Sequence, residues 1–552
     1  MTWQETAKNK RDSVMAAIPQ EWILDTIPSA TEVPNAILFI DSKLTEKERA
    51  ITYSTILELQ PQIQSGKLSA LEVTKAFAHR SALLHQLTNC CAEIFFDKAF
   101  ETATYQDEFF AQHGRTIGPL HGIPLSAKDQ INLEGIDSAM GFVSLINNPI
   151  EKQDVSKLAI ILQQMGAIFF IKTTTPPAMM AYTTTSNIYG ETVNVYNRKV
   201  SCGGSSGGEG ALIGGRGAPL GWGTDIGGSI RVPSSFAGIY GLRGSTNRLP
   251  YCKLTNSFAD QPVLSSVVGP MASDLQDLKY VMELVIQAEP WKFDPKCPPI
   301  PWRDPEQQVP AGKLVFALQS WNKLVMPSPP VKRALAIVKE KLIDAGHDVI
   351  EWDPPISSMT ATQVAVDVYG ADGYKEVVDY TQASGEPIVP EILSLAGGAT
   401  LPKGVGHIHE HWDHAKRRYE VQQAVDDYWF NETTKLTGTG RPVDGIICPV
   451  WDTPSFKTRD IGKFYGDYVA QFNTLDYSVV VVPVLCADKL EDTKPSRSEF
   501  VSDKDEELWE YYDAELVDGC PVGVQVVAPR WQEETAIGLA EVVDGCLRKS
   551  GS

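Results

Sequence analysis

The sequence is poor in cysteine and lacks long apolar runs. Its nine cysteines are odd in number and scattered, apart from Cys90 and Cys91, and none forms a C-x-x-C pair. A disulfide framework is therefore not expected, and a reducing, cytoplasmic setting is. The segment 1–22 contains no apolar run of seven residues, so we expect no secretory signal.

Membrane segments and positive charge are also scarce. The most apolar run, 477–487, contains Pro483 and is much shorter than the roughly 20 residues that a membrane helix needs. With 49 basic and 69 acidic side chains, the chain carries a formal charge of −20. Because this charge repels phosphate groups, we expect neither nucleic acid nor a membrane surface as a partner, but a small molecule.

The 552 residues show the pattern of an α/β protein. Segment 155–166 has apolar residues at helical spacing, ends in Gly166, and precedes a β-prone run at 167–172. Helix followed by buried strand is typical of crossovers in a sheet covered on both faces. The same pattern recurs at 331–346 and 347–352, further buried strands are predicted at 314–317, 445–449, 478–484 and 522–527, and further helices at 70–87 and 532–547.

We predict a single large α/β/α sandwich with a mixed central sheet, spanning residues 1–552. Seven prolines in segment 289–312 indicate an irregular surface connection, and the charged segment 489–510 is predicted to be a solvated excursion. The expected subdivision is a helical covering region at about 1–110, a catalytic core at 111–275, the connection at 289–312, and the rest of the sheet with its covering helices at 313–552.

Glycine and serine are concentrated in two segments, SCGGSSGGEG at 201–210 and GTDIGGSIRVP at 223–233. A flexible linker does not account for the interleaved Asp225, Ile226 and Arg231. Glycine at this density is tolerated where positive φ or close backbone approach is required. Neither segment has the spacing of a P-loop or of a dinucleotide-binding loop, so no nucleotide cofactor is expected.

The second segment has the composition of an oxyanion site. Its glycines allow the backbone N–H groups of Ile226, Gly227, Gly228 and Ser229 to turn inward, with the Ser229 hydroxyl beside them. A nucleophile next to an oxyanion site indicates acyl transfer, and it needs a base. Lys128 ends an apolar stretch, where burial lowers the pKa of an amine toward that of a usable base.

Together these residues resemble the amidase signature family, and the flanking sequence is most similar to its fungal acetamidase branch. The 24 positions from Ser205 to Ser229 agree with the signature, and Lys128 stands at the family's lysine position. The resemblance implies a Ser-cis-Ser-Lys triad, with Ser229 as nucleophile, Ser205 as bridging serine after a cis peptide, and Lys128 as base. It also implies hydrolysis of a carboxamide through an acyl enzyme, without metal or cofactor, in a chain that forms a homodimer.

Four further site residues are predicted. Ser206 lies near Lys128, Asp225 and Arg231 brace the loop, and Met179 matches a family position that borders the acyl site. The whole mechanism requires Lys128 to be buried and within hydrogen-bonding distance of Ser205.

Three alternatives stay open. The G-x-S-x-G pattern at 204–208 makes Ser206 the nucleophile of a Ser-His-Asp esterase, whose base is His347 or a member of the cluster at 407–414. An amidotransferase A-type subunit shares the signature fold, but its tRNA substrate fits the charge of −20 poorly. The third is a zinc site on one helical face, formed by His407, His411 and His414 with His409 nearby.

Overall fold

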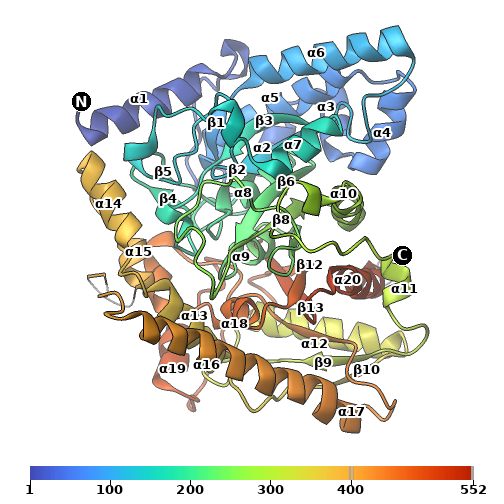
Figure 1. Ribbon diagram of the computed structural model, residues 1–552, viewed down its shortest axis with the longest axis vertical. Coiled ribbons are helices and arrows are strands. Elements are labelled where there is room, and N and C mark those ends of the chain that lie inside the picture. The colour runs from blue at the N-terminus through green and yellow to red at the C-terminus, as the bar shows by residue number, and fades with distance from the viewer. Residues whose placement is uncertain (397–399, 402, 549–552) are drawn as a thin grey trace.

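One mixed sheet of 11 strands runs through the part of the chain that the computed structural model describes, residues 1–396, 400–401 and 403–548. Figure 1 shows it running from the N-terminal strands at the top to the C-terminal strands at the bottom. In spatial order the strands are β1 (Cys91–Ile94), β3 (Ile168–Thr173), β2 (Pro124–Lys128), β6 (Leu220–Asp225), β8 (Val267–Ala272), β7 (Tyr240–Arg243), β12 (Ser478–Cys486), β13 (Pro521–Ala528), β11 (Gly445–Pro449), β9 (Val315–Leu318) and β10 (Asp348–Glu351). The predicted α/β class with a mixed central sheet is confirmed.

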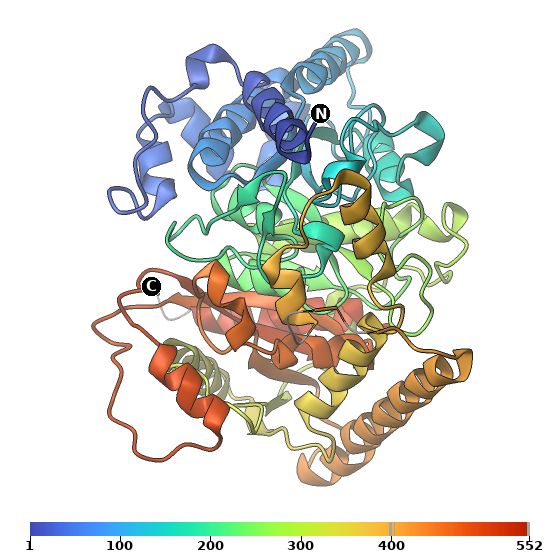
Figure 2. The same ribbon diagram turned by 90° about the vertical axis from the view of Figure 1, so that its left-hand side faces the viewer.

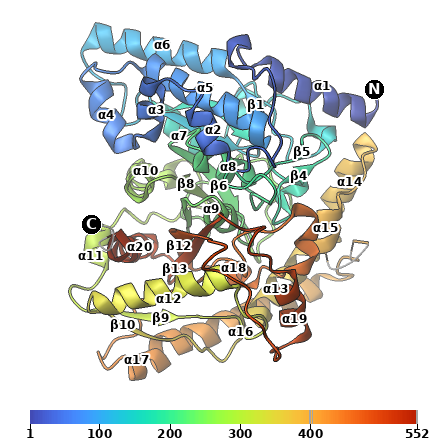
Figure 3. The same cartoon turned by 180° about the vertical axis from the view of Figure 1, so that it is seen from behind.

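Helices cover this sheet at both ends and on both faces. Figure 2 shows the N-terminal helices and the long helix α16 at opposite ends of the molecule, and Figures 1 and 3 show α10 and α20 on one side of the central strands and α9 and α18 on the other. The helices of the first half are α1 (Trp3–Ala16), α2 (Ala36–Asp41), α3 (Glu46–Tyr53), α4 (Ile56–Gln64), α5 (Ala70–Thr88), α6 (Phe96–His113), α7 (Lys157–Gln164), α8 (Gly207–Gly214), α9 (Arg231–Phe236) and α10 (Leu275–Gln287). Those of the second half are α11 (Pro305–Gln308), α12 (Pro329–Asp344), α13 (Ser358–Tyr369), α14 (Lys375–Ser384), α15 (Pro390–Leu395), α16 (Ile408–Asp427), α17 (Thr433–Leu436), α18 (Asp467–Leu475), α19 (Asp503–Tyr511) and α20 (Glu533–Arg548).

Local sequence signals explain where these elements begin and end. Ser69 and Glu72 form a capping box at the start of α5, with each side chain accepting from the other's backbone N–H. Gly166 and Gly346 follow α7 and α12 with φ of 93° and 92°, values that favour glycine. Two predictions are incomplete, because the excursion predicted at 489–510 runs into α19 and the proline-rich connection contains α11.

The sheet brings two strand ends together where the glycine-rich segments lie. Strands β2 and β6 are parallel neighbours, with Ser126 opposite Gly221. Their carboxyl ends therefore meet at one edge, the usual place for a site in a sheet of this type. The loop after β6 leads into α9, and α8 packs against both strands. Among the described helices, none combines the length and apolarity needed to span a bilayer.

Candidate active site

Lys128, the last residue of β2, is wholly buried at this edge. Its Nζ donates to Ser205 Oγ at 2.7 Å. Both conditions set by the sequence analysis, burial and hydrogen-bonding distance to Ser205, are confirmed. Burial lowers the pKa of Lys128 to about 7, although the negative charges of Asp225, Glu209 and Asp129 act in the opposite direction.

Thr224 of β6 fixes the orientation of the lysine amine. Its hydroxyl donates to Gln130 Oε1 at 2.6 Å, so its oxygen is left to accept from Lys128 Nζ, at 2.8 Å. The Thr224 carbonyl accepts a longer bond from the same nitrogen, at 3.5 Å. The sequence analysis assigned no role to Thr224 or Gln130. The parallel pairing of β2 with β6 places Thr224 beside Lys128, so a prediction of this pairing could have identified Thr224.

Two serines of the first glycine-rich segment, Ser205 and Ser206, lie just before α8. The Gly204–Ser205 peptide is cis, as predicted. A side chain at Gly204 would meet the Thr183 carbonyl oxygen at 2.4 Å, so only glycine fits there. Ser206 does not contact Lys128. Instead its hydroxyl lies 3.3 Å from the carbonyl oxygen and 3.4 Å from the N–H nitrogen of Thr224, so it supports the lysine indirectly.

Ser229 and Ser205 line one small pocket. Its free space is about 10 Å³, roughly the room for one water molecule. Met179, at the end of a short 3₁₀ turn, lines the pocket as predicted. No hydrogen bond joins the two serine hydroxyls among the described contacts, and such bonds often form only when substrate is bound. The other lining residues are Gln130, Ala178, Met180, Thr224, Ile226, Asn256, Ser257, Phe258 and Ser266.

Backbone N–H groups for an oxyanion come from the loop between β6 and α9. The prediction that Gly228 contributes is wrong, because its N–H donates to Asp225 Oδ1 at 2.8 Å. The N–H groups of Ile226, Gly227 and Ser229 have no acceptor among the described contacts. Three of the four predicted donors therefore remain free to bind an anion.

Gly228 still has a structural reason to be glycine. Its φ is 126°, and a side chain there would meet the Val469 side chain at 2.4 Å. The loop packs this closely against α18.

Asp225 and Arg231 brace the loop, as predicted. The Arg231 guanidinium donates to Asp225 Oδ2 at 3.0 Å and Oδ1 at 2.9 Å, and Asn473 of α18 donates to Oδ1 at 2.8 Å. Burial alone would raise the pKa of Asp225, but Arg231 and Asn473 outweigh it and hold that pKa well below its usual range. The third guanidinium nitrogen of Arg231, Nη1, donates to Gln525 Oε1 of β13 at 2.9 Å, which ties the loop to the C-terminal half.

Two tyrosine hydroxyls hold the carbonyls of the same loop. Tyr369, at the end of α13, donates to the Ile226 carbonyl at 2.6 Å, and Tyr182 donates to the Gly227 carbonyl at 3.0 Å. Because the C=O and N–H of one trans peptide point in opposite directions, the bond from Tyr369 directs the Gly227 N–H away from the tyrosine. Burial raises the pKa of both tyrosines, so both keep the proton they donate.

A buried carboxyl lies behind the lysine. Glu209 of α8 accepts from Ser126 at 2.6 Å and from Thr173 at 2.9 Å. Burial raises its pKa to about 7, while the two hydroxyl groups and Lys128 lower it. Glu209 and Lys128 therefore titrate in the same pH range, and each charge stabilises the other.

The residues expected for the esterase and zinc alternatives are not brought together in the structure. No histidine lines the pocket that holds Ser205 and Ser229, and the Ser206 hydroxyl faces the Thr224 backbone. In the histidine cluster His407 is the N-cap of α16, and no group of three metal-ligating side chains is arranged around a common point among the described residues. The esterase and zinc alternatives therefore lose their structural basis.

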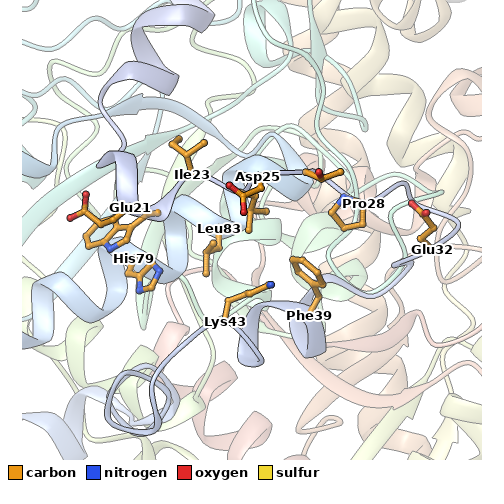
Figure 4. A pocket seen from close by; sticks show the side chains of 12 residues that line it. Glu21, Ile23, Asp25, Pro28, Glu32, Phe39, Lys43, His79 and Leu83 are labelled. Atoms are coloured by element: carbon orange, nitrogen blue, oxygen red, sulfur yellow. The ribbon is translucent and has the colours of Figure 1, made fainter.

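A larger cleft lies away from these residues. Figure 4 shows it between the segment carrying Glu21 and Glu32 and the side chains of Phe39, Lys43 and His79. Its volume is about 640 Å³, but it shares no lining residue with the serine pocket. His79 is already paired with Glu48 at 2.8 Å. Size alone does not identify the site in this molecule.

Known proteins match the chain over nearly its whole length. A family profile described as Amidase matches residues 72–537. An acetamidase of Aspergillus oryzae is 38% identical over 556 residues, which cover 99% of this chain and 99% of the relative. An acetamidase of Emericella nidulans is 39% identical over 554 residues, which cover 99% of this chain and 98% of the relative.

Solved structures match as well. Fatty acid amide hydrolase superposes with a TM-score of 0.91 at 31% identity, covering 99% of this chain and 95% of that chain. A peptide amidase from Stenotrophomonas maltophilia superposes with a TM-score of 0.65 at 19% identity, covering 90% of this chain and 97% of that one. At the lower identity the likeness concerns the fold alone.

Proposed function

We propose that this chain, which belongs to the amidase family, hydrolyses a carboxamide to a carboxylate and ammonia or an amine through Ser229, Ser205 and Lys128. The observation that carries the proposal is the wholly buried Lys128 amine, 2.7 Å from Ser205 in the pocket that Ser229 also lines. With a pKa of about 7, a substantial fraction of this amine is neutral at neutral pH and acts as a base.

The proton path follows from the hydrogen bonds. In the neutral amine the two N–H groups point to the two oxygens of Thr224, and the lone pair points to Ser205. Lys128 accepts the Ser205 proton, and Ser205 accepts the Ser229 proton as Ser229 Oγ forms a bond to the amide carbon. This relay gives a tetrahedral oxyanion without a histidine.

The oxyanion is stabilised by the loop. The N–H groups of Ile226, Gly227 and Ser229 are the available donors, and losing one such donor costs about 3 kcal/mol in comparable sites. Ser205 then gives its proton to the departing nitrogen as the C–N bond breaks, which leaves an acyl ester on Ser229. Water attacks this ester through the same relay, releasing the carboxylate and the free serine.

The serine pocket itself has room for only a small part of the substrate. The serine pocket has about 10 Å³ of free space between Met179, Met180 and Phe258, which leaves no room for a long chain without movement of these side chains. Two relatives that match over nearly full length are called acetamidases. Small aliphatic amides of the acetamide type are therefore the proposed substrates.

The test uses the purified chain with aliphatic amides of graded length, without ATP or tRNA. Ser229→Ala is expected to lower kcat/KM at least 10⁴-fold, whereas the matched change Ser206→Ala costs about tenfold, because Ser206 acts only through Thr224. A serine-directed fluorophosphonate is expected to label Ser229. Labelling of Ser206 instead, or activity that depends on ATP and tRNA, would overturn the proposal, the second result in favour of an amidotransferase.

A further inference from the structure

A second, wider pocket lies beside the serine pocket. Its volume is about 430 Å³, and it shares Ile226, Asn256, Phe258 and Ser266 with the serine pocket. An amide that reacts at Ser229 can therefore extend into this outer pocket. The residues that line the outer pocket would then contact the part of the substrate that does not react.

The wall of the outer pocket holds more positive than negative charge. Asp476 is wholly buried, and it accepts from Arg243 at 2.7 Å and lies 2.7 Å from Arg530 Nε. Thr246 adds two further bonds to the same carboxylate, from its N–H at 2.9 Å and its hydroxyl at 2.8 Å. Burial alone would raise the pKa of Asp476, yet the positive charges of Arg243, Arg530 and Arg418 hold it below its usual value. Three guanidinium groups thus lie near one carboxylate, and two of them, those of Arg418 and Arg530, line the pocket together with Asp476.

Arg418 has no carboxylate partner of its own among the described residues. Its guanidinium donates to backbone carbonyls, among them those of Val263 and Thr474, the latter at 2.9 Å. Burial lowers its pKa to about 10, so it still carries its charge at neutral pH. Lys296 also lines the outer pocket, and it forms an ion pair with the exposed Asp260 at the rim. The rim pair is neutral overall, and the arginine group keeps an uncompensated positive charge.

The rest of the wall suits an anion as well. Asn247, Ser265 and Ser266 add neutral polar groups, and Arg530 is about half exposed, so part of its guanidinium faces the open side. A guanidinium binds a carboxylate with two parallel hydrogen bonds, which makes this pairing geometrically selective. A positive pocket in a chain of charge −20 is a local feature rather than a consequence of composition.

We propose that the outer pocket binds a carboxylate carried by the substrate itself, so that this chain prefers short amides with a second, anionic end over neutral amides of the same length. This inference rests on the proposed function and adds the substrate class. Arg530 and Arg418 are the specificity-determining residues, and Ser229 attacks the amide end while the carboxylate end lies beside them.

The experiment compares matched pairs of amides: succinamate with butyramide, glutaramate with pentanamide, and adipamate with hexanamide. For at least one pair, kcat/KM is expected to be ten or more times higher for the carboxylate member. Arg530→Gln is expected to bring that ratio within about twofold of one, and about 0.5 M NaCl to reduce it by screening. Succinate is expected to inhibit competitively, and more weakly in the Arg530→Gln protein.

Arg417→Gln is the matched control. Arg417 is 48% exposed and pairs with Asp367, just as Arg530 is 47% exposed and pairs with Asp476, but Arg417 does not line the pocket. The control is expected to leave the ratio unchanged. Thermal melts of both variants show whether they are folded.

Three results would overturn the inference alone, and a fourth would overturn the proposed function as well. The first is a ratio of one or less for all three pairs, with the neutral amides hydrolysed; this leaves the proposed function standing. The second is an equal fall of the ratio in the Arg417→Gln protein, which would assign the preference to overall charge. The third is activation of neutral-amide hydrolysis by inorganic phosphate, which would make the pocket an effector site. Failure to hydrolyse any of the six amides overturns the proposed function, and this inference with it.

Discussion

Two lysine side chains are wholly buried on neighbouring strands of the sheet, and their surroundings differ. Lys128, at the end of β2, bonds to the oxygens of Ser205 and Thr224 and forms no ion pair among the described residues. Lys172, in β3, donates to the Asp137 carbonyl and to Ser138 Oγ, the latter at 2.6 Å, and lies 3.7 Å from the carboxylate of Asp129. Both amines are therefore buried and bonded to a serine hydroxyl, but only Lys172 also has a carboxylate within 4 Å among the described residues.

A buried amine bonded to a serine is not by itself a base; the nearby carboxylates and the position of the bonded serine distinguish the two lysines. Burial lowers the pKa of Lys172 too, but nearby carboxylates that include Glu93 and Asp137 oppose the shift. Lys10 of α1 pairs with the same two carboxylates, so this group holds the first helix to the sheet. Carboxylates near an amine retain its proton, and Lys172 lies among them. The hydroxyl partner of Lys128, by contrast, belongs to Ser205, which lines the same pocket as Ser229, and this supports Lys128 as the proposed base.

Removing the two amines in turn should give the largest contrast. Lys128→Met is expected to lower kcat/KM for a short amide by about 10³- to 10⁴-fold, because the proton of Ser205 loses its acceptor. Lys172→Met is expected to lower the free energy of unfolding by about 3–5 kcal/mol, measured by denaturant titration, because buried carboxylates lose their counter-charge. The folded Lys172→Met protein should keep kcat/KM within tenfold. If it loses activity as completely as Lys128→Met does, the contrast is wrong.

The pH dependence of activity sharpens the same contrast. Since the pKa of Lys128 is about 7 and its neutral form is the proposed base, kcat/KM should rise nearly tenfold per pH unit well below pH 7 and level off above it, about 50-fold between pH 5 and pH 7. The profile is measured with a neutral amide.

A variant of Glu209 separates the two groups that titrate near pH 7. Glu209→Gln removes a negative charge that favours the lysine ammonium, so the midpoint should move to lower pH. A profile flat from pH 5 to pH 8 would contradict the assignment of Lys128 as the base.

The smallest expected effect concerns the partner that orients the amine. Thr224→Val removes the hydroxyl that accepts from Lys128, and kcat should fall about tenfold with little change in KM, because the amine is misdirected while the substrate pocket persists. Thr224→Ser keeps the hydroxyl and should restore most of the rate. Equal rates for the valine and serine variants would show that the hydroxyl has no orienting role.

Much of the fold was accessible from the sequence, because buried strands have a strong apolar pattern. The strand predicted at 445–449 coincides with β11, and the helix predicted at 70–87 differs from α5 by one residue. The helix α19 was missed because its charged first turn reads as solvent-exposed, although Leu508 and Trp509 are buried.

Some residues of the site could also be predicted from the sequence, and others could not. Ser229 lies in a glycine-rich segment and Lys128 ends an apolar one, so local composition indicates both, whereas the role of Ser205 came from the family resemblance. Thr224 and Tyr369 have ordinary neighbours in the chain, and their roles arise from contacts across 96 and 143 positions. The Gly228 N–H was misassigned because nothing in a glycine pair shows that a carboxylate three residues earlier takes one of the two amides.

The bonds that brace the nucleophile's loop also set when the chain can become active. Arg231 and Asp225 depend on Asn473 and Gln525, which lie more than 240 positions later. During synthesis on the ribosome, Ser229 emerges long before the segments that hold its loop in place. On the proposed mechanism we therefore expect a nascent or truncated chain to be inactive until Asn473 and Gln525 are in place, near completion of the polypeptide.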